Sequence, residues 1–160
     1  MKKEAKLLLG KAVDSLILSV EHFNRPSDTG RTESTLILLD HSFEMLLKAA
    51  ILHKGGKIRK PREKQVIGFG ECVRKALSDG SVVFLDKSQA MTLQAINTLR
   101  DSAQHHIVTL SEELLYLHAQ SGLTLFKNIR NYSGSQKSEF RSQNETAGNE
   151  KVSAILNSDS

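Results

Sequence analysis

The chain has 160 residues, of which 39% are hydrophobic, and its 22 Lys and Arg against 18 Asp and Glu give a formal net charge of +4. This length suits one domain with a substantial core. The single cysteine excludes an internal disulfide or a zinc ribbon. No run of residues approaches the ~18 apolar residues of a membrane span. The modest positive charge permits a nucleic-acid partner without requiring one. Lys11 and Asp14 interrupt the apolar stretch behind the basic start, which argues against a secretory signal, so we expect a cytoplasmic protein.

Two long amphipathic helices are predicted at the start of the chain. Apolar residues recur at helical spacing over residues 3–24 and again over residues 32–54. The pair Gly55-Gly56 is expected to end the second helix. Three charged residues of that helix are four positions apart and therefore share one side: Asp40, Glu44 and Lys48.

A basic loop is predicted to follow the second helix. Its cations are Lys54, Lys57, Arg59, Lys60, Arg62 and Lys64. Such a run can contact a nucleic-acid backbone, and Lys57, Arg59, Lys60 and Arg62 are the candidate RNA-binding residues. The alternative is a solvated, mobile loop. The loop has no interleaved aromatic residues, so we do not expect base stacking there.

A short third helix is predicted over residues 68–78. Its inward residues are expected to be Phe69, Cys72, Val73, Ala76 and Leu77. Because Cys72 falls within this apolar set, we expect it to serve packing rather than chemistry.

Two capping boxes predict the starts of the last two helices. The fourth helix is expected to begin at Asp86, with Gln89 completing the box, and to run to about residue 105. The fifth is expected to begin at Thr109, with Glu112 in the same role, and to run to about residue 131.

The predicted elements define an all-α fold. Long helices with short connections favour an up-and-down antiparallel bundle of four to five helices, over residues 1–132. From residue 133 the sequence is rich in Ser, Asn, Gln and Glu, so residues 133–160 are predicted to form a disordered C-terminal tail.

Arg100 is placed where the fourth helix should be apolar. On a helical wheel it lies about 20° from Leu93, inside the apolar arc. A charge there needs a partner, because burying an unpaired charge is costly. His105 lies about 140° from Arg100, so one straight helix does not bring the two side chains together. Asp101 and His105 share a face, and the carboxylate is placed to orient the imidazole.

A purely structural interpretation of this stretch is also available. In it, Arg100 is a buried arginine paired with Glu44 or Asp40. His105 and His106 then simply cap the end of the helix, where the helix dipole favours cations. The other four histidines show no metal-ligand spacing with Cys or acidic residues, so no metal site is expected.

These residues resemble a known family. Arg100-Asp101-x-x-x-His105 is similar to the Arg-x(4–6)-His signature of the HEPN superfamily, and residues 38–49 resemble the Glu-x-Leu-Leu-Lys-Ala helix of HEPN-like domains of unknown function in prokaryotes. Residues 12–26 are similar to their first helix. The resemblance spans about residues 3–131 and implies an all-α bundle that is generally dimeric.

The resemblance also implies a function. Many HEPN proteins are metal-independent endoribonucleases of toxin–antitoxin, phage-defence and CRISPR-linked systems, in which the Arg–His motifs of two subunits meet in one cleft. It implies RNA as substrate, a homodimer, an antitoxin or other operon-encoded partner, and no cofactor. Some members have lost catalysis, so the alternative is a non-catalytic module that dimerises or binds a partner or nucleotide.

Roles for individual residues follow from the same resemblance. Arg100 would stabilise the scissile phosphate. His105 would be the general base or acid, and His106 satisfies the same spacing. Asp101 would tune His105 or position RNA. Glu44, with Asp40 beside it on the companion helix, would hold Arg100.

Overall fold

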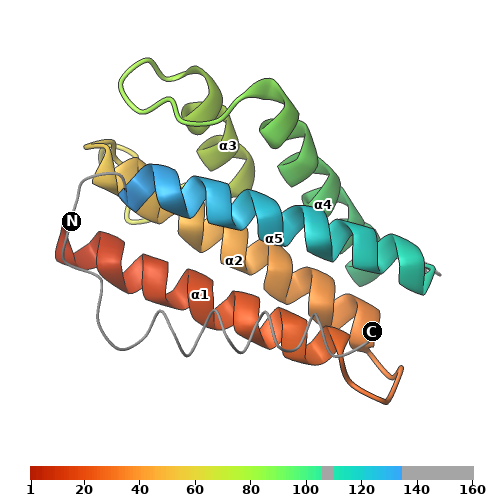
Figure 1. The fold of residues 1–160 in the computed structure, drawn as a ribbon. Helices are drawn as coiled ribbons and strands as arrows, with labels where there is room; N and C mark the ends of the chain where they lie inside the picture. The colour runs from red at the N-terminus through yellow and green to blue at the C-terminus, as the bar shows by residue number, and fades with distance from the viewer. Residues whose placement is uncertain (106–109, 135–160) are drawn as a thin grey trace.

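The computed structural model describes residues 1–105 and 110–134 and confirms the all-α prediction (Figure 1). Its five helices are α1 (Lys3–Phe23), α2 (Arg31–His53), α3 (Phe69–Ser78), α4 (Lys87–His105) and α5 (Glu112–Gly134). The described residues form no named strand, only an isolated bridge between Arg59 and Val66. The predicted tail lies almost entirely outside the described residues. None of the helices described has an apolar stretch of the length needed to cross a membrane.

Helix α2 is the centre of the bundle, because each of the other four helices packs against it. Figure 1 shows α1 and α2 as an antiparallel pair, with α5 running in the same direction as α2. Large apolar side chains of α2 are fully buried, and the ring of Phe43 meets that of Phe126 on α5 edge-on, with centroids 5.9 Å apart. This burial of apolar area is the main favourable contribution to folding.

A glycine allows α5 to approach its neighbours closely. A Cβ atom at Gly122 would lie 3.3 Å from Leu39 on α2 and 3.4 Å from Ile96 on α4. Even an added methyl group would force the side chains of Leu39 and Ile96 to shift, because protein cores are close-packed. At its N-terminus, α5 is fixed by an ion pair between Glu112 and Arg31, the first residue of α2.

The predicted ends of α2 and α4 are confirmed. Gly55 adopts a left-handed φ of 85°, and the Gly56 N–H donates to the carbonyl of Ile51 at 2.8 Å, as in a Schellman cap. At the start of α4, the Asp86 N–H donates to Gln89 Oε1 at 3.0 Å and the Gln89 N–H to Asp86 Oδ1 at 2.8 Å. Both bonds of the predicted capping box are therefore present.

Two local predictions were wrong. Helix α5 begins at Glu112 rather than at the predicted start, and its first turn is capped by Ser111, whose hydroxyl accepts the Leu114 N–H at 3.2 Å. The predicted cap, Thr109, lies outside the described residues. Leu77 is 38% exposed, although it was expected to face inward. The apolar cover at that end of α3 comes instead from the following loop, whose buried residues include Phe84 and Leu85. Their N–H groups donate to the carbonyl of Ala76.

The basic loop is anchored rather than merely solvated. Ile58 and Ile67 are buried, and the N–H of Ile67 donates to the carbonyl of Ile58 at 2.8 Å. Between these two anchors, Arg59 reaches Glu4 on α1 at 3.1 Å. Most of the exposed cations of the loop therefore lie between two buried anchor residues.

Candidate functional site

Arg100 lies at the edge of the interface between α4 and α2, as the helical wheel predicts. Ile96, one turn earlier, is fully buried, whereas the Arg100 side chain is 26% exposed. Its Nε donates to Asp40 Oδ2 at 3.1 Å, and Nη2 lies 3.1 Å from the same oxygen. The other oxygen of Asp40 accepts a hydrogen bond from Asn97 Nδ2 at 2.8 Å. Both oxygens of this carboxylate are therefore paired by α4.

Asp40 is buried, with only 4% of the residue exposed. Burial raises the pKa of its carboxyl group above the ordinary value, while the hydrogen bond from Asn97 and the charge of Arg100 act in the opposite direction. The desolvation effect is the largest of these. Asp40 is thus a costly buried acid whose ionised form depends on Arg100 and Asn97.

Glu44 does not hold Arg100, contrary to what the resemblance implied. Its carboxylate pairs with Lys48, four residues later on the same helix. Lys48 is itself buried, so the nearest available anion is the one that compensates its charge. Of the two carboxylates considered for Arg100, Asp40 is the one that binds it.

Asp101 also contacts Arg100 rather than His105. Asp101 Oδ1 lies 2.8 Å from Arg100 Nη1, and the same nitrogen donates to Gln104 Oε1 at 3.0 Å. The predicted orienting contact from Asp101 to His105 is therefore replaced by an ion pair with the neighbouring residue.

The two predicted catalytic groups stay apart within one chain. His105 is the last residue of α4 and is exposed, and in the described part of the molecule it makes no ion pair or hydrogen bond with Arg100 or Asp101. This agrees with their separation of about 140° around the helix. His106 lies outside the described residues.

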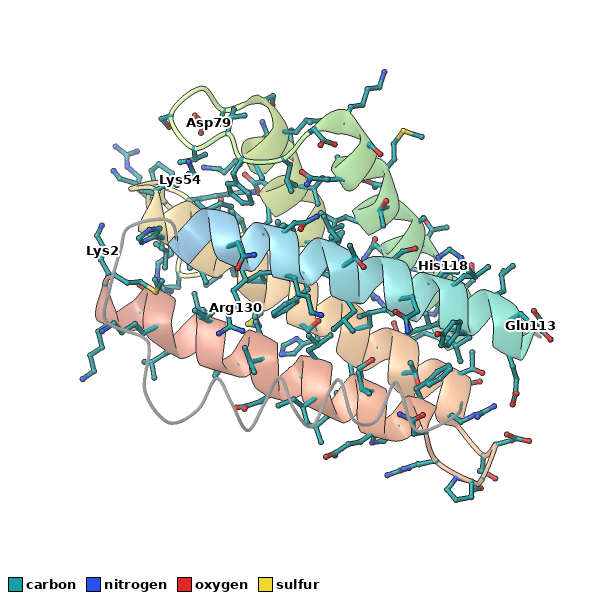
Figure 2. All side chains as sticks on the ribbon, viewed as in Figure 1. Lys2, Lys54, Asp79, Glu113, His118 and Arg130 are labelled. Atoms are coloured by element: carbon teal, nitrogen blue, oxygen red, sulfur yellow. The ribbon has the colours of Figure 1, made fainter. Side chains whose placement is uncertain are left out.

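The basic loop lies at the opposite end of the bundle from this site. Figure 2 shows Lys2 and Lys54 at one end and Glu113, near the start of α5, at the other. Asp40 and Lys54 are 14 positions apart in the sequence, which corresponds to about 21 Å along α2. Lys57, Arg59, Lys60 and Arg62 are exposed there, with Lys60 Nζ 3.9 Å from Glu71. One chain therefore does not bring these cations next to Arg100.

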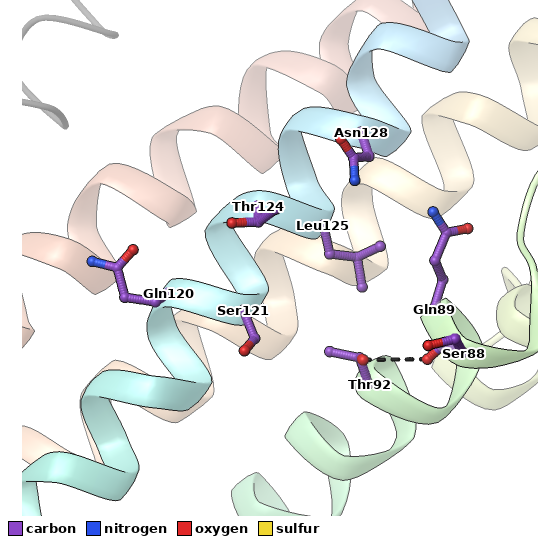
Figure 3. Close-up of a pocket in the computed structure, with 8 residues that line it drawn as sticks. All are labelled: Ser88, Gln89, Thr92, Gln120, Ser121, Thr124, Leu125 and Asn128. Atoms are coloured by element: carbon purple, nitrogen blue, oxygen red, sulfur yellow. Dashed lines mark hydrogen bonds between the residues drawn. The ribbon is translucent and has the colours of Figure 1, made fainter.

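A groove between α4 and α5 was not anticipated from the sequence. It has a volume of about 410 Å³ and is open to solvent. Its lining contains no charged residue: Ser88, Gln89, Thr92, Gln120, Ser121, Thr124, Leu125 and Asn128. Figure 3 shows Gln89 and Asn128 extending into the space between the two helices. The only feature of the sequence that could have predicted this groove is the spacing of small hydroxyl residues on both helices.

Neither the cysteine nor a cluster of ligands suggests other chemistry. Burial raises the pKa of the Cys72 thiol to about 12, so it stays protonated and inert at neutral pH, as its packing role predicts. Among residues 1–105 and 110–134, no group of three or more His, Cys, Asp or Glu side chains is arranged to hold a metal ion.

The fold and the site define a helical-bundle domain with a partly buried arginine fixed by an aspartate of its central helix. The chain belongs to the family described as Domain of unknown function (DUF3644), whose model matches residues 7–153. The match continues past residue 132, where the bundle was predicted to end. No curated protein and no solved structure matches the chain. The similarity to the HEPN superfamily therefore rests on sequence resemblance alone, in the α1, α2 and α4 sequences.

Proposed function

We propose that this protein is a metal-independent endoribonuclease of HEPN type that acts as a cytoplasmic homodimer in a toxin–antitoxin or phage-defence setting. The observation that carries the proposal is the way two aspartates hold the guanidinium group of Arg100. Asp40 fixes the inner edge of its guanidinium group, and the partly exposed outer edge is oriented toward the surface beside Asp101. A positioned guanidinium edge suits the two oxygens of a phosphodiester.

Arg100 has the chemistry to stabilise charge on a phosphate during RNA cleavage. Its position is set before substrate arrives, so little reorganisation is needed as negative charge develops on the phosphate oxygens. His105 supplies the proton transfer, as base toward the 2′-hydroxyl or as acid toward the leaving oxygen. His105 is exposed, so its imidazole is accessible to an RNA strand.

The separation of Arg100 and His105 supports a dimer. Because the two side chains diverge on α4, one copy of the chain offers only half of the machinery. A second copy would complete the cleft with its own His105. The basic loop, about 21 Å away along α2, would contact RNA phosphates remote from the scissile one. An antitoxin or other operon-encoded partner would control access to the cleft.

The second candidate is a non-catalytic HEPN-like module for dimerisation or for partner or nucleotide binding. It is favoured by the number of contacts that Arg100 already makes, to Asp40, Asp101 and Gln104. In this case the arginine is a structural element, and the uncharged groove between α4 and α5 is the more relevant surface.

Inducible expression of the wild type and of variants separates the two candidates. Arg100→Ala alone would leave the buried Asp40 without its charged partner. We therefore combine it with Asp40→Asn and name the product the paired-deletion variant. We expect the wild type to arrest growth and degrade cellular RNA, and His105→Ala and the paired-deletion variant to do neither. His53→Ala, at the far end of α2, is the matched control and should behave as wild type. Equal growth and intact RNA in all strains would contradict the ribonuclease proposal.

A further inference from the structure

The guanidinium group of Arg100 has few hydrogen-bond donors left for a ligand. It carries five N–H groups in a fixed planar arrangement. Nε and Nη2 are directed at Asp40 on the inner edge. On the outer edge, Nη1 contacts both Asp101 Oδ1 and Gln104 Oε1. These contacts use four of the five N–H groups, so a phosphate that binds two N–H groups of Arg100 must replace one of these acceptors.

The two carboxylates differ in how firmly they are held. The Asp40 side chain is 6% exposed, comes from another helix and is also bound by Asn97, so its removal would leave the inner edge of Arg100 and the Asn97 amide without their acceptor. The Asp101 side chain is 53% exposed, and Arg100 is its only partner among the ion pairs of the described residues. Exposed ion pairs contribute little net free energy, so Asp101 is the exchangeable ligand.

Asp101 also resembles the ligand that would replace it. A carboxylate and a phosphodiester each present two oxygens and negative charge to a guanidinium edge. While Asp101 stays on Nη1 it blocks that edge, and its charge repels an approaching phosphate. We propose that Asp101 occupies the phosphodiester position on the outer edge of Arg100 in the free protein and competes with RNA for it. This inference rests on the proposed function.

The proposal predicts that neutralising Asp101 strengthens RNA binding. Asp101→Asn keeps the size of the side chain but removes the charge that competes for Nη1. We expect RNA affinity to rise about twofold to fivefold, the range that corresponds to loss of one exposed competing ion pair. Gln104→Ala removes only a neutral acceptor, so its effect should be smaller.

The test is fluorescence anisotropy with the full chain and a 12-nucleotide RNA whose 2′-hydroxyls are methylated to prevent cleavage. The variants are Asp101→Asn, the paired-deletion variant, and Asp101→Asn within the paired-deletion background. Asp14→Asn is the matched control, because it makes the same charge change at an exposed position on α1. Thermal melting verifies that each protein is folded at the assay temperature.

We expect tighter binding by Asp101→Asn, less than a twofold change in Asp14→Asn, and no gain in the paired-deletion background. If the paired deletion weakens RNA binding but Asp101→Asn does not tighten it, Asp101 does not compete with RNA. The proposed binding of an RNA phosphate by Arg100 is then retained. An equal gain in Asp14→Asn, or a gain that persists without Arg100, also overturns the competition. If the paired deletion leaves affinity unchanged, or no variant binds RNA, the proposed function fails with it.

Discussion

The two cationic regions of this bundle hold their charges in opposite ways. Arg100 is a single cation, three-quarters covered, whose guanidinium meets acceptors from α2 and α4. The basic loop carries several exposed cations at the other end of α2, with single ion pairs such as Arg59 to Glu4. A fixed cation can act on one phosphate at a defined position, whereas an exposed array attracts a backbone without regard to sequence.

The largest expected effect of this difference is on stability. Arg100→Ala should lower the free energy of unfolding by about 3 kcal/mol, because it leaves Asp40 buried without its charged partner. The paired-deletion variant should recover much of this loss, because both partners are then neutral. Urea denaturation measures both values.

Lys60→Ala is the control from the other region. Lys60 is half exposed and 3.9 Å from Glu71, so its removal should cost less than about 0.5 kcal/mol. Equal costs for Arg100→Ala and Lys60→Ala would show that the two regions do not differ in the way proposed.

The next effect concerns the salt dependence of RNA binding. A triple variant, Lys57→Ala, Lys60→Ala and Arg62→Ala, should reduce the slope of log affinity against log salt by about 2, given about 0.7 per phosphate contact on a single strand. The paired-deletion variant should reduce it by only about 0.7. Titrations from low to high salt measure the slopes. A larger reduction from the paired deletion would reverse the assignment of the two regions.

The smallest effect is the pH dependence of stability that Asp40 contributes. Its pKa is raised in the folded protein, so the folded state binds this proton more tightly than the unfolded chain. Stability should therefore fall as the pH rises from the ordinary aspartate value through the raised one, and then level off. Asp40→Asn should lack this fall. Stability curves for the two proteins at matched pH values reveal it, and a rise over that window would contradict the direction of the shift.

The sequence predicted the arginine but not all of its partners. Helical periodicity and the capping-box motif are both local properties. Periodicity placed Arg100 in the apolar arc of α4, and the motif placed both capping-box bonds at Asp86. The choice between Asp40 and Glu44 depends on the register between α2 and α4, which periodicity does not contain. For the same reason, the groove between α4 and α5 was missed.

Asp101 was assigned to the wrong partner for a different reason. Wheel positions compare directions of Cβ atoms, and they place Asp101 beside His105. The side chain of Arg100 is long, and its Nη1 lies 2.8 Å from the carboxylate of the adjacent Asp101. Side-chain length therefore outweighed helical spacing.

The most direct test of the account is cleavage of a labelled single-stranded RNA by the purified protein in EDTA. We predict that the wild type cleaves the RNA but not DNA of the same sequence, which lacks the 2′-hydroxyl. His105→Ala and the paired-deletion variant should leave the RNA intact. Cleavage at the wild-type rate by either variant, or no cleavage by the wild type, would contradict the role given to Arg100 and His105.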